Sequence, residues 1–140
     1  MEKSEARSYC IVGDGECQEG QIWEAAMYAA ARKLDNLMVI IDVNGFQNEK
    51  SVIETLPIGS LKAKWQSFGW HVFEIDGHDF QQILQTYTEA KKIEEKPSVL
   101  IAHTVKGKGV EYMENNNAWH SKLITDSEYE EAMAFLTNPI

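Results

Sequence analysis

The chain has 140 residues, which favours a single domain, and 44% of them are hydrophobic, which argues against disorder. Its formal net charge of −9 disfavours a protein that binds nucleic acid by neutralising phosphates. No apolar run approaches the ~18 residues of a membrane span, and no signal peptide follows Met1. We therefore expect a cytoplasmic protein with neither nucleic acid nor membrane among its partners.

Short apolar runs alternate with amphipathic segments along the chain. We expect strands at 8–13, 37–43, 71–76 and 98–103, and helices at 21–34, 61–68, 80–95 and 126–136. A polar lead-in is expected at 1–7, a loop at 51–59 and a long loop at 104–120. This alternation predicts an α/β fold with a mostly parallel β-sheet and helices on both faces.

Several side chains are expected to point into the core. The strand at 8–13 reads as buried, with Cys10 as a small core residue. The helical spacing at 80–95 directs one set of side chains inward: Phe80, Ile83, Leu84, Tyr87 and Ala90. Cys17 does not share a zinc-ligand spacing with Cys10, so we expect neither a zinc site nor thiol chemistry.

The most informative stretch runs from Gly13 to Gln47. It opens with Gly13-Asp14-Gly15 after the first strand, and Asn44 follows the second strand. Glycines let a backbone approach a ligand closely, and free N–H groups at a helix start favour an anion. Asp14 and Asn44 both fall at carboxyl ends of parallel strands, where open α/β sheets bind ligands. Their oxygens suit Mg²⁺ with a diphosphate completing the shell, although Asn44-Gly45 could also be a hairpin turn.

These residues resemble the thiamine diphosphate motif, and the longer string resembles transketolase, in particular the N-terminal subunit of split enzymes. The string runs Gly13-Asp14-Gly15-Glu16-Cys17-Gln18-Glu19-Gly20-Gln21-Ile22-Trp23-Glu24-Ala25-Ala26. The resemblance covers nearly the whole chain. It implies one domain over residues 1–140, equivalent to the C-terminal portion of the family's diphosphate-binding domain, and hence a partial thiamine-diphosphate-binding fold.

The resemblance also assigns roles near the proposed metal. It makes Asp14, Asn44 and the carbonyl of Phe46 ligands of Mg²⁺ or Ca²⁺, and it places Gly13, Gly15 and Glu16 around the cofactor diphosphate. Lys106 could also meet phosphate charge, whereas Lys108 reads as a solvated lysine.

Three further residues are catalytic candidates by the same resemblance. Glu19 and Glu24 match acidic positions that link two active sites across a dimer interface. Both could instead be glutamates that stabilise the N-terminus of the following helix through the helix dipole, and for Glu24 the two interpretations stay open. His120 matches the histidine that approaches the diphosphate and the substrate hydroxyls, where an imidazole can donate or shuttle a proton. Ser121 stands where the family has glycine.

The resemblance implies a component of a multi-chain transketolase-like enzyme that transfers a two-carbon ketol unit from a sugar phosphate or related ketose. The pyrimidine-binding domain is expected from another chain, in a homo- or hetero-oligomer, so the isolated chain should be inactive. The family segment before Gly13 could come from a separate half-domain, unless the sequence is a fragment or a diverged relic. The alternative is a non-catalytic domain that acts as a structural or regulatory partner. Other thiamine diphosphate enzymes are disfavoured by Gln18-Glu19-Gly20-Gln21-Ile22-Trp23-Glu24.

Overall fold

The computed structural model describes residues 6–48 and 50–137, so most of the predicted lead-in lies outside it. Four parallel strands form one sheet in the order β1 (Ser8–Gly13), β2 (Leu37–Val43), β6 (Ser98–His103) and β5 (His71–Asp76). The helices are α1 (Gly20–Ala31), α2 (Val52–Thr55), α3 (Leu61–Ser67), α4 (Phe80–Ala90) and α5 (Asp126–Thr137). The predicted α/β fold is confirmed, and the bounds of all four strands agree with the sequence prediction.

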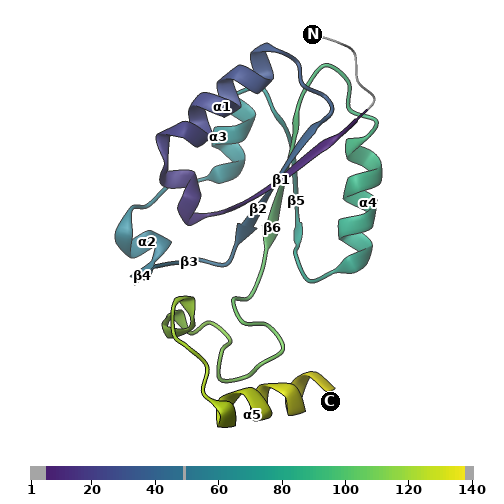
Figure 1. Cartoon of the computed structure of the whole chain (residues 1–140). Coiled ribbons are helices and arrows are strands. Elements are labelled where there is room, and N and C mark those ends of the chain that lie inside the picture. Colours follow the sequence, from purple (N-terminus) through teal and green to yellow (C-terminus); the bar gives the residue numbers. More distant parts are fainter. Residues whose placement is uncertain (1–5, 49, 138–140) are drawn as a thin grey trace.

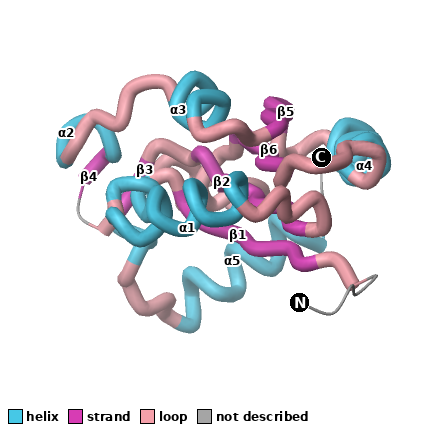
Figure 2. The backbone as a smooth tube through the Cα atoms, turned by 90° about the horizontal axis from the view of Figure 1, so that it is seen from above, coloured by secondary structure: helices cyan, strands magenta, loops and turns pink. Residues whose placement is uncertain are grey.

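The sheet lies between two unequal helical layers. Helices α1 and α3 cover one face, and α4 covers the other near β5 (Figures 1 and 2). The larger core cluster lies under α1 and α3 and includes Trp65, Trp70 and Ile41. The Trp70 indole N–H donates to the Ala26 carbonyl at 2.9 Å, which satisfies the polar atom of this ring inside the core. The smaller cluster under α4 is formed by Met38, Ala90, Leu100 and Ala102.

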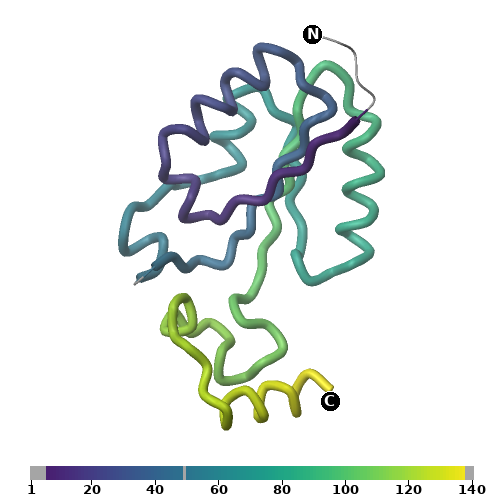
Figure 3. The backbone as a smooth tube through the Cα atoms, in the orientation of Figure 1, coloured from purple at the N-terminus to yellow at the C-terminus, as the bar shows by residue number. Residues whose placement is uncertain are grey.

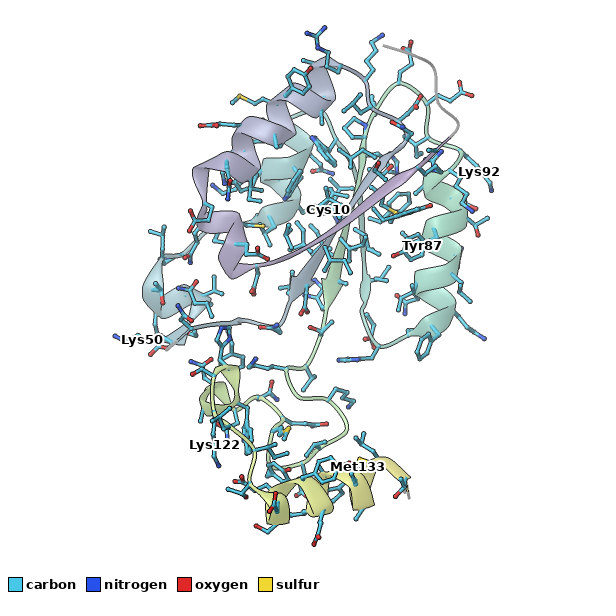
Figure 4. The ribbon with its side chains drawn as sticks, in the orientation of Figure 1. Cys10, Lys50, Tyr87, Lys92, Lys122 and Met133 are labelled. Atoms are coloured by element: carbon cyan, nitrogen blue, oxygen red, sulfur yellow. The ribbon has the colours of Figure 1, made fainter. Side chains whose placement is uncertain are left out.

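β1 is an edge strand and is largely exposed, so its predicted burial is wrong. Tyr9 is 47% exposed and Ile11 is 73% exposed, and both belong to the face of the sheet on which α4 lies, because Tyr9 meets Tyr87 of α4 and residues two apart on a strand share a face. The ring of Tyr9 meets Tyr87 of α4 at a centroid distance of 5.4 Å, which leaves Ile11 uncovered. Cys10, labelled on β1 in Figure 4, is exposed rather than a core residue, and Cys17 is the buried cysteine.

Helices α1, α3 and α4 end at Ala31, Ser67 and Ala90, earlier than the predicted residues 34, 68 and 95. α1 ends at Ala31 because Lys33 adopts a left-handed conformation, with φ 52°, and the amides of Lys33 and Leu34 bond back to Ala30 and Ala29. In α4, Phe80 is 79% exposed and Leu84 is 66% exposed, so these two residues do not point inward as expected.

The segment after Asn44 is more ordered than the predicted loop. β3 (Phe46–Gln47) pairs antiparallel with β4 (Lys50–Ser51), and α2 follows directly. Ser51 caps α2 in a reciprocal capping box with Glu54. Asn44 and Gly45 therefore precede a short hairpin and do not form its turn.

The C-terminal part of the chain lies beyond the carboxyl edge of the sheet. Figure 3 shows the loop after β6 descending from the sheet and turning back beneath it before α5. The 3₁₀ helix η2 (Asn117–His120) lies within this loop. Across the part of the chain that the structure describes, no helix is long and apolar enough to cross a membrane.

Candidate cofactor site

The strand order brings three chain segments together at one edge of the sheet. Asp14 directly follows β1. Asp42 lies near the end of β2, and Asn44 lies in the turn that follows β2. Thr104 directly follows β6. The backbone amide of Asp14 donates to the backbone carbonyl of Asp42 at 3.0 Å, which joins the first two segments. Because the pairing is parallel, all these residues leave the sheet on the same side.

Asp14 is buried, with 4% of its surface exposed, and its carboxylate is held by backbone amides. Its Oδ1 accepts from the N–H of Gly15 at 2.9 Å, and its Oδ2 accepts from the N–H of Gly45 at 2.8 Å. Burial raises the pKa of Asp14 above its ordinary value, and the nearby Asp42 carboxylate raises it further. A cation at this carboxylate would offset both effects.

Asn44 is fixed in the turn that follows β2. Its Nδ2 donates to Asp42 Oδ2 at 3.1 Å, and its Oδ1 accepts from the N–H of Phe46 at 3.0 Å. Gly45 has φ 80°, a backbone conformation that favours glycine. Since Gly45 also donates to Asp14, this turn ties Asp14 and Asn44 together.

An open cavity of about 480 Å³ lies over these groups. It contains every sequence-predicted site residue except Glu24. The cavity is lined by Gly13, Asp14, Gly15, Glu16, Gln18, Glu19, Asn44, Phe46, Gln47, Asn48, Lys106 and His120. Glu24 lies on α1, outside this lining, and is exposed.

The two glutamates at the cavity mouth differ in their contacts. Glu16 folds back so that its Oε2 accepts from the N–H of Gly13 at 2.6 Å. The amide that could meet an anion therefore binds a carboxylate of the chain itself. Glu19 occupies the N-cap position of α1, but its side chain makes no capping hydrogen bond.

The loop after β6 brings Lys106 and His120 to the cavity. Gly107 has φ 74°, and a Cβ there would lie 2.5 Å from the Met113 carbonyl oxygen, so the loop requires glycine at this point. The side chain of Asn117 donates to the Asn48 carbonyl at 3.2 Å, which tethers η2 to the hairpin. His120 is exposed at the end of η2, whereas Lys108 lies outside the cavity, 3.8 Å from Glu114.

Oxygen ligands and acidic charge characterise the cavity. Three carboxylates line it, against the positive charge of Lys106 and an imidazole, so a diphosphate would need a divalent cation to bind beside Asp14. No cluster of three or more His, Cys, Asp or Glu side chains suited to a metal occurs within residues 6–48 and 50–137. A site here must combine carboxylate, amide and carbonyl oxygens, as hard cations prefer.

Two further features fit a ligand at this position. Gln47 Oε1 is buried without a hydrogen-bond partner among the described residues. A Cβ on Gly15 would lie 2.9 Å from Gln47 Cβ, so the absence of a side chain on Gly15 leaves the room that Gln47 fills. In contrast, burial raises the pKa of Cys17 to about 12, which keeps this thiol protonated and unreactive.

Sequence reasoning missed Asp42, Thr104 and Gln47. Asp42 had a local signal, since residues two apart on a strand share a face and Asp42 lies two positions before Asn44. Thr104 and Gln47 had none, because their contacts with Asp42 and Gly15 join segments far apart in sequence.

Comparison with known proteins identifies the family to which the chain is similar. Residues 1–137 match the family described as transketolase, thiamine diphosphate binding domain. The 6-deoxy-6-sulfo-D-fructose transketolase subunit SqwG of Clostridium sp. is 43% identical over 128 residues, covering 91% of this chain and 46% of the relative. An apulose-4-phosphate transketolase subunit from Phocaeicola vulgatus is 42% identical over 133 residues, covering 95% of this chain and 47% of the relative. The chain thus spans about half the length of these curated relatives.

Solved structures show the same likeness. The structure of transketolase from Campylobacter jejuni superposes with a TM-score of 0.86 at 31% sequence identity. The match covers 93% of this chain and 20% of that one.

Proposed function

The chain belongs to the family of the transketolase thiamine diphosphate binding domain, and we propose that it is one component of a multi-chain transketolase-like enzyme. The enzyme would transfer a two-carbon ketol unit between sugars. The observation that carries this proposal is the convergence of Asp14, Asn44 and His120 on one cavity from three separate segments. A domain kept only for its shape has no physical need of this combination.

In this proposal Asp14, Asn44 and the Phe46 carbonyl would hold Mg²⁺ or Ca²⁺, and the cation would offset the charge of the cofactor diphosphate. Bound thiamine diphosphate would supply the reactive carbon centre that breaks and forms the carbon–carbon bond. Gly13 and Gly15 would line the diphosphate position, although the space beside Gly15 is filled by Gln47, and Glu16 holds the Gly13 amide at 2.6 Å.

His120 and Lys106 are the groups of the cavity that can meet anionic oxygens from the loop side. We propose that His120 donates hydrogen bonds to the diphosphate and to a substrate hydroxyl. It would also take up or release the proton of that hydroxyl. Lys106 adds a fixed positive charge. Glu19 and Glu24, both exposed on the α1 side of the cavity, are proposed to face a second active site across the interface with another subunit.

The two curated relatives are named for a sulfonated ketose and a ketose phosphate. We propose a donor of that class, a ketose with an anionic end. Which sugar it is depends on groups that this cavity does not contain.

We further propose that additional polypeptide completes the site, in the same chain or a separate one. It would comprise a segment equivalent to the remaining half of the relatives and a pyrimidine-binding subunit. The exposed apolar residues of β1, Tyr9 and Ile11, support a covered edge in the assembly. We expect the chain alone to be inactive, and we propose that the assembly is cytoplasmic.

The test is Mg²⁺-dependent binding of thiamine diphosphate, measured by calorimetry on the chain alone and on the chain co-expressed with proteins encoded beside it. Replacing Asp14 with Asn should weaken binding at least 10-fold, since it removes the charge that neutralises the cation. Asp126→Asn, an exposed carboxylate on α5, serves as the matched control and should leave binding unchanged.

Two outcomes would contradict the proposal. A folded assembly that binds no thiamine diphosphate in any combination would favour the non-catalytic partner role instead. Binding that Asp14→Asn leaves unchanged would refute the assignment of the metal ligand.

A further inference from the structure

Asp42 lies where three strand ends meet. Its carbonyl accepts from the amide of Asp14 after β1, at 3.0 Å. One oxygen of its carboxylate accepts from Asn44 Nδ2 at 3.1 Å, and the other accepts from the hydroxyl of Thr104 after β6. No other residue in the described ranges makes side-chain hydrogen bonds to both Asn44 and Thr104.

Thr104 is itself held in place. Its amide donates to the Val43 carbonyl at 3.0 Å, which continues the pairing of β6 with β2. A Cβ on Gly77, at the end of β5, would lie only 2.5 Å from Thr104 Cγ2. Glycine at position 77 therefore leaves the space into which the Thr104 side chain fits.

This arrangement decides how the Asn44 amide is oriented. A carboxylate only accepts hydrogen bonds, so Asp42 selects the NH₂ side of the Asn44 amide. The Asn44 oxygen is then turned away from Asp42, toward the Phe46 amide at 3.0 Å. Without Asp42, the Phe46 N–H alone would hold the amide in this orientation, so the amide would be less firmly fixed against a flip that points a nitrogen where a cation needs an oxygen.

We propose that Asp42 and Thr104 are positioning residues that fix the Asn44 amide so that its oxygen faces the metal. This inference rests on the proposed function, because it concerns the same cation site. Asp42 and Thr104 act through Asn44 and are not assigned as ligands. Partners of this kind commonly change metal affinity 10- to 100-fold when they are removed.

The first experiment needs no ligand. In the ¹⁵N-labelled chain, the side-chain NH₂ group of Asn44 should give two well-separated proton signals that exchange slowly with water, because one proton is held by Asp42. Thr104→Val keeps the shape of the side chain and removes the hydroxyl, and Asp42→Ala removes both carboxylate oxygens. Both should move these signals toward those of an exposed asparagine and speed their exchange. Unchanged Asn44 signals in both variants would overturn the inference, whether or not the chain binds a cofactor.

The second experiment is a Mg²⁺ titration in the presence of thiamine diphosphate, in the preparation in which the wild-type protein binds. Thr104→Val should weaken the Mg²⁺ Kd about 10-fold or more, and Thr104→Ser, which keeps the hydroxyl, should restore it. Thr88→Val removes a threonine hydroxyl from α4, where it bonds to the Leu84 carbonyl, and is the matched control.

The outcomes separate the two claims. A purely structural role for Thr104 would lower the unfolding midpoint but leave the Kd of the folded protein unchanged, which would overturn the positioning role alone. Absence of Mg²⁺-dependent binding in the wild-type protein would instead refute the proposed function, and the Asn44 signals would still decide the orientation of the amide.

Discussion

Gly15 begins η1 (Gly15–Gln18) and Gly20 begins α1, and a methyl group would meet different surroundings at each. At Gly15 the added carbon would lie 2.9 Å from Gln47 Cβ and 3.0 Å from Gln47 Oε1, whereas at Gly20 it would meet nothing within 4 Å. We expect Gly15→Ala to lower the free energy of unfolding by about 1–3 kcal/mol, since Gln47 or the turn must shift. Urea denaturation measures the change.

Gly20→Ala is the matched control for this prediction. Position 20 is the first residue of α1, where alanine costs nothing sterically and should raise the free energy of unfolding by up to about 1 kcal/mol. Equal midpoints for the two variants would mean that Gln47 moves aside freely and that Gly15 is not needed for packing.

Individual residues of the site were predictable where the signal is local. Asp14 follows a strand directly between two glycines, and Asn44 follows the next strand, so the parallel alternation places them at one edge. Asp42 differs, because its role depends on Thr104, a contact between residues 62 positions apart. Such a contact exists only after β6 has paired with β2.

At the scale of the element, strand bounds followed from composition but strand burial did not. The β-branched run of β2 marks a central strand, and its neighbours on both sides are β1 and β6. β1 has similar apolar residues, yet its position at the edge leaves Ile11 exposed. Periodicity reports the faces of a strand but not its place in the sheet. α2 has only four residues, too few for a periodic signal, although Ser51 and Glu54 have the capping-box spacing that marks its start.

α5 and the loop before it depend on one carboxylate. Glu128 accepts from the amide and hydroxyl of Thr125 and pairs with Lys122, whose Nζ lies 4.2 Å from the Trp119 ring centroid. The hydrogen bonds from Lys122 and Thr125 lower the pKa of Glu128 to about 2, from its ordinary 4.5. A lowered pKa stabilises the folded state above the unfolded pKa, and this stabilisation is lost as the pH falls through the folded value.

We therefore expect Glu128→Gln to loosen the start of α5 near neutral pH. The difference from the wild-type protein should shrink as the pH falls from about 4.5 toward 2. The indole N–H of Trp119, which donates to the Tyr112 carbonyl at 3.2 Å, gives an NMR signal whose melting can be followed. Glu130→Gln, on the same helix, is the control. A difference that persists at the lowest pH would show that the loss of charge is not its cause.

For the whole molecule, the sheet has one protected edge region and one open edge. β1 and β5 are both edge strands, with no strand on their outer sides in the described ranges, but α3 and α4 lie on opposite faces near β5 whereas Ile11 of β1 is exposed. An exposed apolar strand edge is a site for association with another chain or segment. The chain matches about half the length of its curated relatives, so the proposed assembly includes polypeptide able to cover this edge.

We expect Ile11→Lys to leave the isolated chain folded and to prevent its assembly with partner polypeptide. Ile11 is 73% exposed, so the substitution removes few contacts, with a change in stability within about 0.5 kcal/mol. In the assembly a lysine there would bury a charge in an apolar interface, which is strongly unfavourable. Size-exclusion chromatography of the co-expressed proteins measures the loss, and iodoacetamide labelling of exposed Cys10, which points to the opposite face from Ile11, reports whether that side of β1 is covered too. Phe80→Lys is the control, since Phe80 is 79% exposed at the start of α4, which follows β5 at the opposite edge of the sheet. An assembly that forms equally well with Ile11→Lys, and that leaves Cys10 freely labelled, would place the partner elsewhere on the molecule.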